Sequence, residues 1–138
     1  MRNILLVLIM TIPSFNTFAY EGLPREQIKK FFKDVGKGQA NEAIDRLYSE
    51  NPVLSANEAG KAVIKQQTAS APAIFGAFLG HENVHVDKLS DSVVRYVEIA
   101  KYANHPITWE FYFYKPKDKW FVVQCGFIDR FQIIDSKM

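Results

Sequence analysis

The sequence has only one cysteine, Cys125, so no disulfide can form within the chain and packing alone has to hold the fold. It also has no block of charge of one sign, because 17 Lys and Arg residues are scattered among 15 Asp and Glu residues. This balance argues against a nucleic-acid surface, and the basic residues at 25–37 are typical of a solvated helix face. No nucleotide-binding glycine loop, nucleophile elbow or metal-protease helix is present, so we expect no catalytic motif, no cofactor and no metal site.

Long apolar runs are scarce as well. The run at 4–12 is too short for a membrane span, follows Arg2 and precedes the small-x-small tripeptide at 17–19. This layout predicts a signal peptide over residues 1–19 and no stable membrane anchor. We expect export to the periplasm or the medium, and a single domain over residues 20–138.

Three helices are expected in the first part of that domain. Apolar residues recur at i, i+3, i+4 and i+7 over residues 24–35 and again over residues 40–48. A capping box from Ser55 to Glu58 then predicts a third helix running toward Phe78. Its expected apolar stripe comprises Ala59, Ala62, Val63, Ile74 and Phe78, and Pro72 should kink or end it.

After Gly80 the apolar period changes from 3.6 to 2, which predicts four strands near residues 84–87, 92–102, 107–114 and 120–127. The segment at 127–134 is expected to continue or end the sheet. The fold class is therefore α+β, with three N-terminal helices packed on a curved antiparallel sheet of four or more strands.

The hairpin over residues 109–123 holds seven aromatic residues, and both of its faces are apolar. If Lys115 lies opposite Lys119, the odd-numbered residues form a purely apolar face that belongs against the helices. The other face then presents large side chains that combine an apolar body with a polar tip, as protein interfaces do. We expect a homodimer interface there, formed by Tyr112, Tyr114, Trp120 and Val122.

The second strand leaves two alternatives open. A five-residue loop before the hairpin would point Arg95 inward, whereas a four-residue loop would point Glu98 inward together with Ala100 and Tyr96. Either charge would need a partner or water. With polar groups from the helices, a mostly apolar pocket is expected. Its predicted ligand-binding residues are Tyr48, Gln66, Gln67, Arg95, Glu98 and Trp109.

Two other candidate sites are weaker. His81, His85 and Asp87 share one side of the first strand by parity, but Val84 and Val86 are expected to hold the inner face and to send them to solvent. Cys125 has apolar neighbours, which raise a thiol pKa, so it is expected to be a buried packing residue rather than a nucleophile.

The sequence resembles the nuclear transport factor 2-like, or cystatin-like cone, superfamily. The resemblance is carried by three helices before a meander and by "GHE" at residues 80–82, "Y…HP" at 102–106 and "FYFYKPKDKW" at 111–120, which are similar to a group of small exported bacterial proteins of unassigned function. It implies a cone with a cavity at its wide end and dimerisation through the outer sheet face. The superfamily includes enzymes and non-enzymes.

We therefore expect an exported, non-catalytic domain that binds a small apolar ligand or a protein partner, and not nucleic acid. The alternative is a small lyase, isomerase or hydrolase that uses Glu98 or Arg95 in the cavity. That alternative requires at least one of these two side chains to be buried.

Overall fold

The computed structural model describes residues 22–128, so the expected signal peptide and the segment after Ile128 lie outside the described residues. Four helices come first: α1 (Pro24–Gly36), α2 (Ala40–Tyr48), α3 (Pro52–Ala56) and α4 (Glu58–Phe75). Four strands follow: β1 (Phe78–Lys88), β2 (Val93–Tyr102), β3 (Pro106–Tyr114) and β4 (Phe121–Ile128). The expected α+β class is confirmed.

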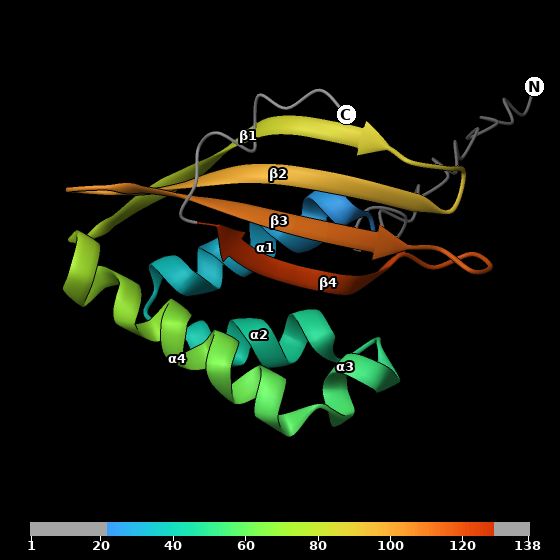
Figure 1. The fold of residues 1–138 in the computed structure, drawn as a ribbon, viewed down its shortest axis with the longest axis horizontal. Helices are drawn as coiled ribbons and strands as arrows, with labels where there is room; N and C mark the ends of the chain where they lie inside the picture. Colours follow the sequence, from blue (N-terminus) through green and yellow to red (C-terminus); the bar gives the residue numbers. More distant parts are fainter. Residues whose placement is uncertain (1–21, 129–138) are drawn as a thin grey trace, which may run out of the picture.

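The strands form one antiparallel sheet in the order β1-β2-β3-β4, and the helices pack on one of its faces (Figure 1). Helix α1 contacts β1, α2 contacts β4, and α4 packs against α2 as a further layer. Each strand is joined to the next by a short turn, so the sheet is a simple meander. We call the face that meets the helices the inner face and the opposite one the outer face.

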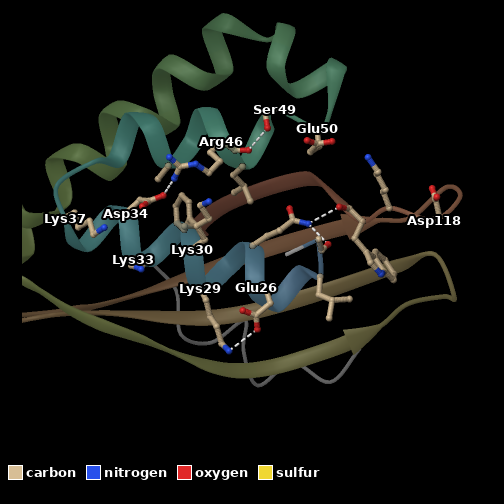
Figure 2. A pocket seen from close by; sticks show the side chains of 18 residues that line it. Glu26, Lys29, Lys30, Lys33, Asp34, Lys37, Arg46, Ser49, Glu50 and Asp118 are labelled. Carbon is tan, nitrogen blue, oxygen red and sulfur yellow. Dashed lines mark hydrogen bonds and ion pairs between the residues drawn. The ribbon is translucent and has the colours of Figure 1, made fainter. Parts of the chain in front are cut away.

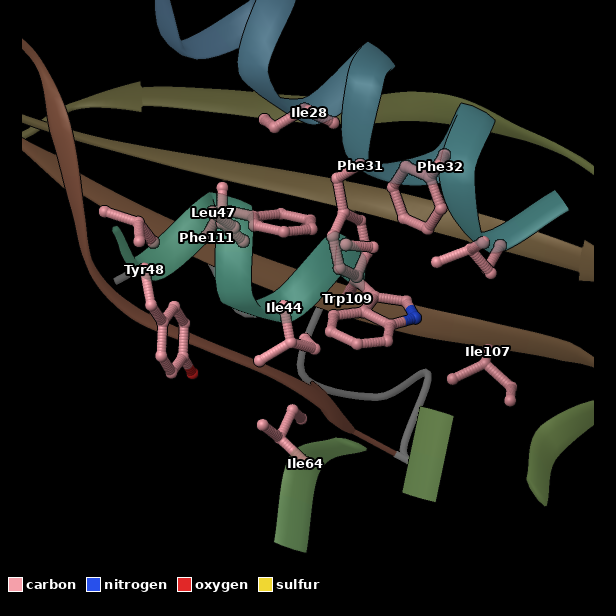
Figure 3. Packing of buried hydrophobic residues seen from close by; sticks show 14 of the residues in the cluster. Ile28, Phe31, Phe32, Ile44, Leu47, Tyr48, Ile64, Ile107, Trp109 and Phe111 are labelled. Atoms are coloured by element: carbon pink, nitrogen blue, oxygen red, sulfur yellow. The ribbon is translucent and has the colours of Figure 1, made fainter. Parts of the chain in front are cut away.

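The core lies between α1, α2 and the inner face of β3 (Figure 3). The expected periodicity of the first two helices is confirmed, since Ile28, Phe31, Phe32, Ile44 and Leu47 are all buried. Aromatic rings from α1 meet rings from β3 edge to face, as aromatic pairs prefer. The ring centroids of Phe31 and Trp109 are 5.1 Å apart.

The third and fourth helices differ from the expectation in two ways. Asn51 caps a short helix that was not expected, α3, by accepting hydrogen bonds from the amides of Val53 and Leu54. Asn57, and not Ser55, caps α4, through a 3.0 Å hydrogen bond from the amide of Gly60. The predicted capping box is therefore wrong, because the chain turns at Asn57 before the long helix begins.

The buried stripe of α4 was also placed wrongly. It consists of Ile64, Thr68 and Ala71, whereas Val63 and Ile74 are 56% and 67% exposed. A threonine can be buried in this stripe because the Thr68 hydroxyl donates to the Ile64 carbonyl within the helix, at 2.6 Å. Pro72 lies inside α4, which continues to Phe75 before Gly76 ends it.

The pairing of β2 with β3 settles the alternative that the sequence left open. Glu98 lies opposite Trp109 and Tyr96 lies opposite Phe111, which is the register of the four-residue loop. Because partners in a sheet share a face, Glu98 points inward and Arg95 points outward. Glu98 is only 3% exposed.

The expected hairpin register is wrong along the whole hairpin, since Trp109 lies opposite Phe127 and not opposite Cys125. Phe113 lies opposite Val122, whereas Tyr112 lies opposite Gln124, so Val123 is an extra residue in β4. This bulge reverses the face of every β4 residue before it, which places Val122 in the core at 0% exposure and Phe121 opposite Tyr114 on the outer face. Beyond the bulge, Cys125 and Phe127 face inward as expected.

Gly76 gives a test of the link between the helices and the sheet. Its backbone has φ 88° and ψ −177°, and an added Cβ would lie 2.9 Å from the side chains of Ala103 and Asn104. We expect Gly76→Ala to lower the free energy of unfolding by about 2–3 kcal/mol in urea titrations. Gly126→Ala is the control, because nothing lies within 4 Å of its added Cβ. Equal stability of the two variants would contradict this account.

Candidate functional site

The inner face carries one buried carboxyl group, that of Glu98. It accepts hydrogen bonds from the Asn83 amide at 2.8 Å and pairs with Nδ1 of His81 at 3.0 Å. Asn83 is the direct β1 partner of Glu98, and His81 lies opposite Ala100, one pair along the same face. A buried carboxyl group is costly unless it is hydrogen-bonded, and these two contacts offset that cost.

His81 is fixed from the helix side as well. Its ring stacks on Phe32 of α1, with centroids 4.4 Å apart and planes 19° apart. The expectation that His81 and His85 share one side of the strand is wrong, because β1 shifts register between Asn83 and His85. That bulge sends His81 inward and His85 outward. Within residues 22–128 we find no group of three His, Cys, Asp or Glu side chains that could hold a metal ion.

Arg95 lies on the outer face in a chain of ion pairs. Its guanidinium contacts Asp87 at 2.8 Å and Glu110 at 2.5 Å, and Asp87 contacts His85 at 2.5 Å. Burial alone would raise the pKa of Asp87, but the hydrogen bonds from Arg95 and His85 outweigh it and lower that pKa. Arg95 thus neutralises two carboxylates of the outer face and does not face the core.

Tyr48 is buried at the far side of the core, where its hydroxyl lies 3.3 Å from Cys125 Sγ. Burial raises the pKa of Tyr48 and raises the pKa of Cys125 to about 11. Cys125 is therefore protonated at neutral pH, which agrees with its expected role as a packing residue.

The six predicted ligand-binding residues do not meet in one pocket. Gln66 and Gln67 are exposed on α4, Arg95 is on the outer face, and Tyr48 contacts Cys125. Only Glu98 and Trp109 are direct neighbours on the inner face. Sequence periodicity missed this separation because it assigned Gln66 and Gln67 to the pocket, whereas the buried polar residue of α4 is Thr68, one and two residues further along the helix.

The four predicted interface residues are also divided between two faces. Tyr112 and Tyr114 lie on the outer face, beside Arg95 and Phe121. Val122 is in the core, and the ring of Trp120 packs against the core from the helix side. The expectation that Val122 belongs to an outer interface is wrong because of the bulge at Val123. Trp120, one residue before β4, lies on the same side as Val122.

A groove of about 1070 Å³ runs between α1, α2 and the turn that precedes β4. Figure 2 shows the lysines of α1, Arg46 of α2 and the side chains of Ser49 and Glu50 just after α2 along it, with Asp118 near one end. At the junction of the three elements, the Gln27 side chain donates to the carbonyls of Gly22 and Trp120, at 2.8 and 2.9 Å. Gln27 therefore ties α1 to the turn and forms part of the groove wall.

A second cavity, of about 430 Å³, lies on the other side of the same junction. Its apolar wall consists of Leu23, Pro24, Val94, Tyr96 and Trp120. Leu23, Glu26 and Trp120 line both cavities, so the two are adjacent around the N-terminal end of α1. No sequence motif points directly to this site, although Leu23, just before Pro24, is an apolar residue at the start of a helix.

Among solved structures there is a likeness to most of this chain. A crystal structure from Campylobacter jejuni, described as an NTF2-like transpeptidase, matches with a TM-score of 0.56 over 72% of this chain and 95% of that chain. The chain has a nuclear transport factor 2-like fold. At 14% identity the likeness shows the fold alone. No protein-family model matches the sequence, and neither does any curated protein compared with it.

Glu98 is predicted to stabilise this nuclear transport factor 2-like domain. Glu98→Ala removes the acceptor of both His81 and Asn83 and leaves a cavity beside Trp109. We expect a loss of about 2–4 kcal/mol in the free energy of unfolding, measured by urea titration. The control is Glu82→Ala, which removes an exposed carboxylate from the neighbouring strand β1 and should change stability by about 0.5 kcal/mol or less. A Glu98→Ala variant as stable as this control would show that the buried contacts contribute nothing.

Proposed function

We propose that this protein is an exported, non-catalytic binding domain, and that its ligand occupies the paired cavities at the N-terminal end of α1. The observation that carries this proposal is that a polar groove and an apolar cavity share Leu23, Glu26 and Trp120. Small-molecule sites typically have volumes of about 300–1000 Å³ and combine an apolar wall with a few polar groups. The smaller cavity meets both conditions.

The shared residues suit a binding role. Leu23 is 38% exposed although it is aliphatic, and Trp120 is only half-buried. An exposed leucine beside a half-exposed tryptophan gains free energy when a ligand covers both, at about 25 cal/mol per Å² of apolar surface removed from water. The ring of Trp120 is also held in place, since Lys115 Nζ lies 5.0 Å from its centroid.

The burial of Glu98 and Arg95 gives the enzymatic alternative some support, but their positions give it none. Glu98 and Arg95 are both largely buried, which is the condition that this alternative required. However, neither side chain lines either cavity at the end of α1, and both already have partners. The name of the Campylobacter jejuni protein does not change this, because the similarity is confined to the fold. We therefore favour binding over catalysis.

Export rests on the pattern of residues 1–19, which lies outside the described residues, and it is part of the proposal. No helix within residues 22–128 has the length and apolar character needed to span a membrane. A small apolar ligand or an apolar segment of another exported protein would fit the smaller cavity. The following test addresses the first of these.

Leu23→Asp tests the site without endangering the fold. Leu23 is the N-cap of α1 and makes no side-chain cap hydrogen bond, so aspartate should stabilise the helix there while placing a charge in both cavities. We expect native mass spectrometry of protein purified from a cell envelope to show a bound small molecule on the wild type. The bound mass should be absent from Leu23→Asp, whose melting temperature should not fall.

Val63→Asp is the matched control, because Val63 is an exposed aliphatic residue on α4 and lines neither cavity. It should keep the bound mass. The proposal fails if the wild type carries no small molecule, or if Leu23→Asp retains it as well as Val63→Asp does.

Self-association through the outer face remains a separate prediction, now limited to Tyr112 and Tyr114. Tyr114 is 37% exposed and packs edge to face on Phe121, with centroids 5.8 Å apart. If this pair forms a dimer contact, Tyr114→Asp should convert a dimer to a monomer in sedimentation equilibrium, since it buries an unpaired charge. A wild type that is already monomeric, or a dimer unaffected by the change, would contradict the prediction.

A further inference from the structure

We infer that the ligand of the paired cavities is a single-chain amphiphile with an anionic head, its hydrocarbon chain in the smaller cavity and its head along the lysines of the groove. The inference deepens the proposed function and rests on it. It goes beyond the small apolar ligand proposed above, because it assigns a charge to the ligand and an orientation to its binding.

The first step concerns the smaller cavity, which has no free charge on its apolar wall. The charged residues that line it are Lys88 and Asp91, which pair with each other at 2.8 Å, Glu26, which pairs with Lys29, and Arg25, which is exposed to water. A chain of methylene groups can therefore lie against Val94, Tyr96 and Trp120 without removing an unpaired charge from water. A polar head would have to remain outside this wall.

The second step concerns the groove, where positive charge is in excess. Two of its acids are already neutralised, since Asp34 pairs with Arg46 and Glu26 pairs with Lys29. The remaining cations are Lys30, Lys33, Lys37 and Lys119, none of which forms an ion pair within the described part of the chain. Only two further acids, Glu50 and Asp118, also line the groove.

The third step is the geometry that joins the two cavities. Leu23 and Trp120 line both, and Lys119 directly precedes Trp120. A head group bound near Lys119 thus lies next to the apolar wall and not at the far end of the groove. Lys30 lies one helical turn beyond Glu26, the third residue that the cavities share, and faces the groove (Figure 2).

The test uses four soluble probes with the same alkyl chain: laurate, dodecyl phosphate, dodecyl maltoside and dodecyltrimethylammonium, all below their micelle-forming concentrations. Binding is followed by tryptophan fluorescence, since Trp120 lines both cavities and Trp109 is buried in the core. We expect the anionic probes to bind about fivefold more tightly than the maltoside, with the cationic probe weakest, and the preference to shrink as salt is added. Laurate and dodecyl phosphate together distinguish a carboxylate head from a phosphate head.

The double variant Lys30→Gln/Lys119→Gln should remove the preference for anionic probes and leave binding of the maltoside unchanged. Its matched control is Lys101→Gln/Lys117→Gln, which removes the same charge from exposed residues that line neither cavity. The control should keep the preference. If both double variants lose it equally, the overall field of the protein is responsible and the assignment of the head group is overturned.

Leu23→Asp separates this inference from the proposed function. If all four probes bind equally well to the wild type and none binds to Leu23→Asp, the site stands and the anionic head is wrong. If no probe binds the wild type, the amphiphile is overturned, while the mass spectrometry experiment still decides whether the cavities hold another small molecule.

Discussion

The contact of the two phenylalanines of α1 with the aromatic rings of β3 is the constraint on which the rest of the structure depends. Phe31 and Phe32 each meet both Trp109 and Phe111, with ring centroids between 5.1 and 6.0 Å apart. These four rings fix the rotation of α1 about its axis. Because Phe31 and Phe32 face the sheet, the lysines at positions 30, 33 and 37 have to line the groove on the other side.

The same contact organises the polar group within the core. Phe32 also stacks on His81, and His81 in turn meets Glu98, the β2 partner of Trp109. A buried carboxyl group directly beside Trp109 would be costly without its two hydrogen bonds. The helix and the edge strand β1 therefore cooperate, since β1 supplies both His81 and Asn83 and α1 holds the histidine ring in position.

The fold could be predicted largely because two signals were strong. The periodicity of residues 24–48 identified the buried faces of α1 and α2, and the change to period 2 after Gly80 identified the sheet. The buried face of α4 could not be derived in the same way. Its outer residues include alanine and valine, and its inner ones include Thr68, so hydrophobicity alone points to the wrong stripe.

The candidate site was less predictable because it depends on single-residue irregularities. One extra residue in β4, Val123, moves Trp120 and Val122 from the outer to the inner side, and one shift in β1 separates His81 from His85. The alternation of apolar and polar residues along a strand does not show where a bulge inserts an extra residue. A prediction that assumes strict alternation therefore assigns the residues on one side of each bulge to the wrong face of the sheet.

These irregularities also explain why binding is expected at the end of α1 and not at the buried charges of the sheet. Glu98 is satisfied by His81 and Asn83, and Arg95 by Asp87 and Glu110. A ligand that displaced either set would have to replace contacts already formed in a site partly shielded from water, at a cost of about 1–3 kcal/mol for each group left unpaired. Trp120, which lines both cavities with Leu23, presents half-buried apolar surface next to lysines that form no ion pair within residues 22–128, and a ligand there gains contacts without breaking any ion pair.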